Sequence, residues 1–189
     1  TDERVGWTET YNLPTNDPEK AMKVMAWTAS HADALKAQAG VPNTGRKATE
    51  GPVYSYSLAW AKHQQPDEGE MRDAVDSSLV YLRLSGHEAV AVEHTETDHP
   101  HVHVIVNLVN PENGKQSSPY NDHLIHSKWA EEFERKHGGI LIESRVENNQ
   151  RRDAGEYVKH RQNKADRAAE INGLYQSSDS PKAFKAALE

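Results

Sequence analysis

The spacing of apolar residues predicts five short strands. β-Branched and aromatic residues are concentrated in residues 4–12, and residues 53–60 alternate between apolar and polar side chains. Two further strands, residues 88–94 and 101–109, follow one another across a tight turn. A short apolar run at residues 140–143 predicts the fifth.

Three other segments place apolar residues three and four positions apart, which is typical of amphipathic helices. The first covers residues 19–39 and ends before Gly40, and the second covers residues 67–85 and ends before Gly86. In the third, residues 121–137, apolar side chains recur at successive i+4 positions. Helices and strands are therefore interleaved along this part of the chain.

The composition changes after Ser144. Residues 145–170 are densely charged, with basic residues interleaved with acids, which indicates a solvated helix or an arm. A polar stretch at residues 177–181 precedes a last short helix. We therefore expect one domain over residues 1–145 and a charged helical extension over residues 146–189.

Composition and charge narrow the possible chemistry. The chain of 189 residues contains 22 Lys+Arg, 29 Asp+Glu and no Cys, and its formal net charge is −7. The absence of Cys excludes disulfides, thiolate metal sites and cysteine nucleophiles. No apolar run approaches the roughly 18 to 20 residues of a membrane segment. Because the chain is acidic overall, a nucleic-acid partner would require local basic patches.

Histidines are frequent, at 11 of 189 residues, and several cluster in the last strand pair. Because side chains alternate along a strand, His101 and His103 share one face with Ile105 and Asn107. The intervening residues point to the other face, toward a core: Val102, Val104, Val106 and Leu108. His94 ends the preceding strand, and the short link after it would bring it back beside the pair.

Three neutral imidazoles that converge from adjacent strands make a divalent-metal site with open positions for water and substrate. The ligands here would be His94, His101 and His103. Asp98 could accept the second ring N–H of one ligand and fix its tautomer. The alternative, ordinary strand or surface histidines, is disfavoured by the H-x-H spacing directly after another His and two acids.

The other histidines are expected on the surface of helices and loops. His99 precedes Pro100, which disrupts a strand ladder and indicates a turn. The remaining seven are scattered along the chain: His31, His63, His87, His123, His126, His137 and His160.

This motif resembles the metal motif of HUH-type nucleases, in particular the relaxases of plasmid mobilisation and conjugation, of the MobA type and the T-DNA-border type. The family motif consists of a His, a short spacer with acids, an H-x-H flanked by hydrophobic residues, and an Asn. The chain matches it with His94, Asp98, His101, His103 and Asn107. Since the order of helices and strands is also similar, the resemblance covers roughly residues 1–145.

The resemblance implies an α+β fold of the HUH endonuclease type, a two-layer α/β arrangement with a helical C-terminal appendage. A central antiparallel sheet, flanked by helices, would carry the histidines on its central strands. One divalent ion, Mg²⁺ or Mn²⁺, would be held by His94, His101 and His103 and would bind the scissile phosphate oxygens. Asp98 would orient a ligand or act as general base.

The implied activity is metal-dependent nicking and transfer of single-stranded DNA at an origin of transfer, through a phosphotyrosine intermediate. The implied partners are this DNA, accessory mobilisation proteins and a coupling protein, in the cytoplasm of a bacterium. Two alternatives stay open, namely an HUH nuclease of replication or transposition and a DNA-binding module that lacks its nucleophile.

The nucleophile of the family is commonly a Tyr near the N-terminus, and here the match is incomplete. The helix predicted over residues 19–39 contains no Tyr, and Tyr11 is the sole Tyr before residue 54. Tyr11 is either the nucleophile or an aromatic strand residue, in which case the nucleophile would precede Thr1. We favour the second interpretation.

Basic residues predict where DNA phosphates would bind. Arg46 and Lys47 lie in a loop rich in Gly, Pro and Thr, and Arg151 and Arg152 lie in the charged extension. Unpaired bases could stack on one of three aromatic residues: Trp7, Tyr11 and Trp60.

Overall fold

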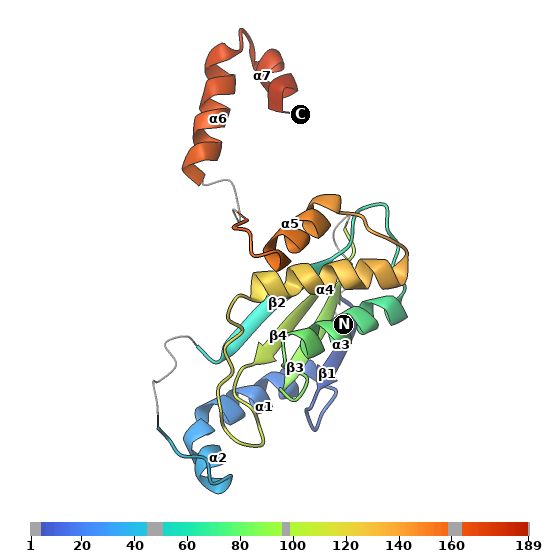
Figure 1. Ribbon diagram of the computed structural model, residues 1–189. Coiled ribbons are helices and arrows are strands. Elements are labelled where there is room, and N and C mark those ends of the chain that lie inside the picture. Colours follow the sequence, from blue (N-terminus) through green and yellow to red (C-terminus); the bar gives the residue numbers. More distant parts are fainter. Residues whose placement is uncertain (1–4, 45–50, 96–98, 159–163, 189) are drawn as a thin grey trace. The chain divides into compact units, whose positions relative to one another are not determined.

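The computed structural model describes residues 5–44, 51–95, 99–158 and 164–188. The chain forms two compact units, residues 1–141 and residues 142–189 (Figure 1). The boundary expected from the composition, after residue 145, lies inside a helix, because the second unit begins with a helix that starts at Glu143.

A fully antiparallel sheet is the centre of the first unit (Figure 1). Its strands lie in the order β1-β3-β4-β2, and every neighbouring pair is antiparallel. They are β1 (Val5–Tyr11), β2 (Val53–Ala59), β3 (Ala89–His94) and β4 (His101–Asn107). The predicted α+β fold with a central antiparallel sheet is therefore confirmed.

The prediction of a fifth strand at residues 140–143 is wrong. Residues 140–142 belong to no strand, and Glu143 begins a helix. Leu141 and Ile142 are 50% and 44% exposed, so no sheet neighbour covers them. An apolar run this short does not by itself specify a strand, since it needs a partner with which to pair.

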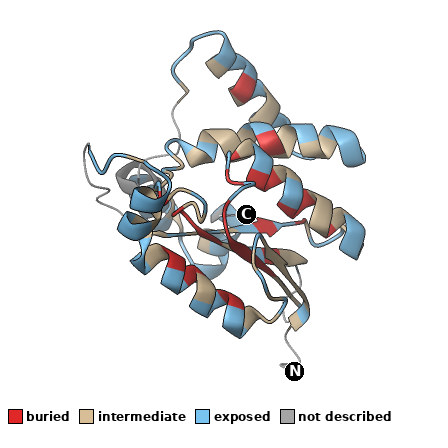
Figure 2. Ribbon diagram, turned by 90° about the horizontal axis from the view of Figure 1, so that it is seen from below, coloured by how far each residue is buried: buried red, intermediate tan, exposed pale blue. Residues whose placement is uncertain are grey.

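One face of the sheet forms the main core (Figure 2). The valines predicted to face a core, Val102, Val104 and Val106, are fully buried there. They pack against the helices α3 (Glu68–Tyr81) and α4 (Asp122–His137).

The helix α1 (Pro18–Ser30) packs on the opposite face. Its Ala21 and Met25 are buried against Val90 of β3. Because Val90 lies opposite Ile105 and His94 lies opposite His101, α1 contacts one end of this face and the histidines lie at the other end.

One predicted helix is interrupted, and another ends earlier than expected. The first is interrupted at His31, which separates α1 from α2 (Ala32–Gln38). The ring of His31 and the hydroxyl of Ser30 both bond the carbonyl oxygen of Trp27, at 2.8 Å each, and such local side-chain bonds compete with helix geometry. The helix α3 ends at Tyr81 instead of residue 85, because Arg83 adopts a left-handed conformation with φ of 60°.

The second unit is helical throughout its described elements. It contains α5 (Glu143–Asp153), α6 (Lys164–Ser177) and α7 (Pro181–Leu188). Tyr175 and Phe184 bring α6 and α7 together with their rings 5.4 Å apart. Among the described residues of the chain, no helix has the length and apolarity needed to span a membrane.

Candidate metal centre

The three predicted ligands converge at one end of the inner strand pair. His94 is the last residue of β3 and lies directly opposite His101, the first residue of β4. His103 follows two residues later on the same face. One ring nitrogen from each lies within 4.8 Å of the others, and the ring centroids are 4.7 to 5.4 Å apart.

The register of the sheet explains this convergence. Residues that face each other in an antiparallel pair point their side chains to the same side. The buried valines on the other side of β4 fix which face the histidines occupy, because a slip by one residue would expose the valines. Packing of the core therefore sets the geometry of the candidate site.

One ring nitrogen of each of two ligands, Nδ1, has a hydrogen-bond partner. Nδ1 of His101 lies 3.0 Å from the carbonyl oxygen of His99, and Nδ1 of His103 lies 2.8 Å from Oγ of Ser57 on β2. With Nδ1 engaged in this way, Nε2 is the nitrogen that His101 and His103 present to an ion.

The surroundings of His103 favour its neutral imidazole. Burial lowers the pKa of His103, and the neighbouring His94 and His101 lower it further. Neutral imidazole is the form that ligates metals, so the three side chains fit one divalent ion with further positions for water or substrate. Nitrogen donors suit first-row transition ions such as Mn²⁺ better than Mg²⁺, which prefers oxygen.

The structure assigns none of the other predicted site residues in the motif, the loop or the second unit to this centre. Asp98, Arg46 and Lys47 lie outside the described residues, so their roles stay predictions. In the second unit, Arg151 pairs with Glu156 at 2.8 Å, and Arg152 donates to an amide oxygen at 3.0 Å.

Tyr11 lies on the face of the sheet opposite to the histidines. It pairs with Ala89 in the ladder and packs against the main core. Its hydroxyl donates to Glu9 at 3.2 Å, and burial, Asp76 and Glu9 raise its pKa. The structure does not bring Tyr11 to the three ligands, and its environment stabilises the neutral phenol.

The aromatic residues proposed for base stacking are packed inward. Trp7, like Tyr11, packs against the core, and Trp60 is 8% exposed with its indole N–H bonded to Glu70 at 3.1 Å. Sequence reasoning missed Trp27, which is 55% exposed on α1 and stacks on His31 with centroids 4.3 Å apart. Its position outside the apolar stripe of the predicted helix could have indicated this exposure.

The predicted surface position is wrong for two of the other histidines. His87 is 4% exposed, and its two ring nitrogens bond the carbonyl oxygen of Asn107 at 2.9 Å and the hydroxyl of Ser117 at 3.0 Å. His126 is half-buried and bonds the hydroxyl of Tyr54 at 3.1 Å. Burial lowers the pKa of both imidazoles.

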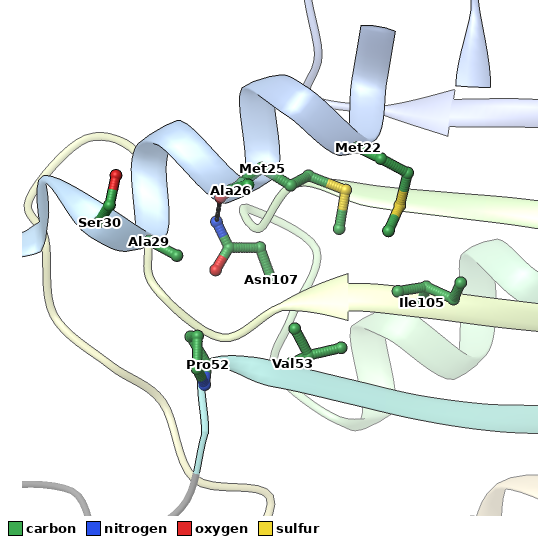
Figure 3. A pocket seen from close by; sticks show the side chains of 9 residues that line it. All are labelled: Met22, Met25, Ala26, Ala29, Ser30, Pro52, Val53, Ile105 and Asn107. Carbon is green, nitrogen blue, oxygen red and sulfur yellow. Dashed lines mark hydrogen bonds between the residues drawn. The ribbon is translucent and has the colours of Figure 1, made fainter. Parts of the chain in front are cut away.

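A cavity of about 400 Å³ lies between α1 and the strands β2 and β4, on the same face of the sheet as the histidines (Figure 3). Apolar side chains of α1, together with Val53 and Ile105, form most of its wall. Asn107 is 2% exposed at its edge, and its amide donates to the carbonyl of Met25 at 3.1 Å and to Glu88 at 2.9 Å. These bonds hold α1 against the sheet at the end of this face that lies away from His94 and His101.

The sequence of the chain is similar to that of known proteins. A family model described as "Relaxase: MobA/VirD2-like, nuclease domain" matches residues 1–139. Protein TraI of Escherichia coli is 23% identical over 106 residues, which are 56% of this chain and 14% of that protein. Protein MobA of Acidithiobacillus ferrooxidans is 32% identical over 60 residues, which are 32% of this chain and 15% of that protein. No solved structure matches significantly.

Proposed function

The chain belongs to the MobA/VirD2-like relaxases through their nuclease domain, and on that premise we propose that it nicks single-stranded DNA at an origin of transfer. We further propose that His94, His101 and His103 bind one divalent ion for this reaction, Mg²⁺ or Mn²⁺. The observation that carries the proposal is the convergence of three ring nitrogens within 4.8 Å at one end of the sheet.

A bound divalent ion supplies charge neutralisation and polarisation at a phosphoryl group. The residues of this chain hold the ion by neutral imidazoles and orient two of these by hydrogen bonds at Nδ1. Asp98 is proposed to orient a further ligand or to accept a proton, as the motif implies.

We propose that the strand is cut by a tyrosine hydroxyl that forms a 5′-phosphotyrosine, and that Tyr11 is not this nucleophile. Tyr11 would have to leave the core and cross to the other face of the sheet. Three other tyrosines, Tyr54, Tyr56 and Tyr81, also pack against the main core, on the face opposite to the histidine triad (His94, His101 and His103). Residues 1–189 alone should therefore bind metal and DNA but form no covalent adduct.

For the DNA strand we propose phosphate contacts at Arg46, Lys47, Arg151 and Arg152, and stacking on Trp27. Each phosphate contact releases counterions, so the affinity should fall as salt rises, and charge reversal at Arg46 and Lys47 should reduce that dependence. Accessory mobilisation proteins and a coupling protein are the further partners proposed, in a bacterial cytoplasm.

The metal site is tested by titrating the chain with Mn²⁺ in a calorimeter. His101→Ala and His103→Ala should each lower the affinity at least about 100-fold, because one of three ligands is lost. Both variants should keep the circular dichroism of the wild type. His123→Ala, on α4 and away from the triad, is the control for loss of an imidazole. Unchanged affinity in both triad variants would refute the metal site.

Cleavage is tested with Mn²⁺ and a labelled single-stranded transfer-origin oligonucleotide, followed by a denaturing gel. We expect binding without a covalent adduct, which is also what a DNA-binding module without a nucleophile would give. An adduct that disappears in Tyr11→Phe would overturn our assignment of Tyr11. An adduct that persists in this variant would identify another residue as the nucleophile.

A further inference from the structure

Ser57 holds one of the candidate ligands from a neighbouring strand. It lies directly opposite His103 in the pairing of β2 with β4, and its Oγ is 2.8 Å from Nδ1 of His103. The motif in the sequence contains no hint of this contact, since the two residues are far apart along the chain.

The contact at Nδ1 decides which nitrogen of His103 can bind an ion. When Nδ1 carries the hydrogen, it donates to Ser57, and the lone pair of Nε2 is left for an ion. When Nε2 carries the hydrogen, the hydroxyl of Ser57 donates to Nδ1 instead, and no lone pair faces the ion. A hydroxyl can support both tautomers, because it both donates and accepts.

His101 differs from His103 in this respect. Its Nδ1 lies beside a main-chain carbonyl, that of His99, which only accepts and therefore fixes the metal-binding tautomer. No side-chain substitution removes that carbonyl, whereas the partner of His103 is a side chain. The tautomer of His103 is thus the part of the centre that a single substitution can alter.

We propose that Ser57 is a positioning residue of the metal centre, which accepts the Nδ1–H of His103 and directs Nε2 toward the ion. The proposal rests on the metal site proposed above. It extends that site to a residue of β2, so that three strands contribute to the centre.

The chain offers a matched control in Ser55. It lies on the same strand and the same face as Ser57, and it is likewise exposed, but it pairs with Ile105 instead of a ligand. Replacing either serine by alanine removes the same atoms from the same kind of site. A difference between the two variants therefore reports the contact with His103.

The first measurement is the affinity of residues 1–189 for Mn²⁺. Ser57→Ala should weaken binding by about 10- to 100-fold, the range found for lost partners of metal-binding histidines, and Ser55→Ala should bind like the wild type. The pair Ser57→Thr and Ser57→Val separates the hydroxyl from the shape, because these two side chains are nearly isosteric and both suit a strand. Only the Thr variant should retain most of the affinity.

The second measurement does not depend on metal. Long-range ¹H–¹⁵N spectra of the metal-free protein show which ring nitrogen of His103 carries the hydrogen. The ratio of tautomers should change in Ser57→Ala and Ser57→Val and should be preserved in Ser55→Ala. A role of Ser57 in strand stability alone would not alter this ratio.

The results of these measurements distinguish a failure of the proposed role of Ser57 from a failure of the proposed metal site. If Ser57→Ala and Ser57→Val bind Mn²⁺ like the wild type while His103→Ala does not, the role of Ser57 is refuted and the metal site stands. If His101→Ala and His103→Ala also bind like the wild type, the metal site itself is refuted.

Discussion

The two faces of the sheet carry similar ring side chains in opposite situations. On the face covered by α3 and α4, the hydroxyl of Tyr54 donates to Asp122 at 2.9 Å, and Tyr56 shares a hydrogen bond of 2.7 Å with Ser78. On the other face, the rings of the triad turn toward one another. The neighbours of a titratable ring therefore help to indicate whether it contributes to packing or to a candidate site.

The pKa shifts follow the same division. Burial raises the pKa of Tyr56 to about 12, and burial and Asp122 raise that of Tyr54, so both phenols stay neutral and act within the core. The lowered pKa of His103 instead keeps a lone pair available for a metal. The two covered phenols therefore remain hydrogen-bonding partners within the core, while His103 remains able to ligate a metal.

The largest contrast between the faces should come from one substitution made at two adjacent residues of β4. Val104→Asp places a carboxylate in a fully buried position and should lower the free energy of unfolding by more than about 4 kcal/mol, enough to prevent folding. His103→Asp should remain folded, because this side chain is on the exposed part of the other face. Urea unfolding measures both, and equal losses would contradict the division into faces.

A smaller effect on the free energy of unfolding is expected from pH. It should arise from His126, which lies on the side of the sheet covered by α3 and α4. Burial lowers its pKa, so the unfolded chain takes up a proton first as pH falls. The free energy of unfolding should decrease as pH falls through about 6.5, the unfolded value, and this loss is complete below the pKa of the folded protein.

His126→Gln should remove this part of the pH dependence, measured as the difference between the urea-unfolding profiles of variant and wild type. His123→Gln, at an exposed position on the same helix, is the control. Identical profiles for wild type and His126→Gln would show that the folded environment does not penalise the charged ring.

The smallest effect concerns the exposed side of α1. Trp27→Ala should weaken binding of a single-stranded oligonucleotide by about 1 kcal/mol, roughly fivefold, because one base loses its stacking partner. The free energy of unfolding should change by less than about 0.5 kcal/mol, since Trp27 is 55% exposed. Fluorescence anisotropy measures the affinity. Tyr120→Ala, which removes an 81% exposed ring elsewhere, should bind like the wild type.

Local patterns carried most of what the sequence could predict. The alternation in β4 placed His101 and His103 on one face and the valines on the other, and the short link brought back His94, because these relations span few residues. The contact of Ser57 with His103 depends on the register between distant strands. The burial of His87 depends on Ser117 and Asn107 around it, which no periodicity reveals.

Helix ends were predicted less well for the same reason. Gly40 and Gly86 signalled where helices should stop, yet α1 is interrupted at His31 and α3 ends before Arg83. In the first case side chains bond a carbonyl, and in the second a non-glycine residue adopts the left-handed conformation. Both depend on detailed local geometry that hydrophobic spacing does not encode.

The strand order β1-β3-β4-β2 has a consequence for the kinetics of folding. The two strands that are synthesised first lie at the edges, and neither has a partner until β3 and β4 exist. The hairpin of β3 and β4 closes a short loop, whereas docking either edge strand closes a long one, at a greater cost in chain entropy. Nucleation is therefore expected in the hairpin that carries all three candidate ligands, with the edges added afterwards.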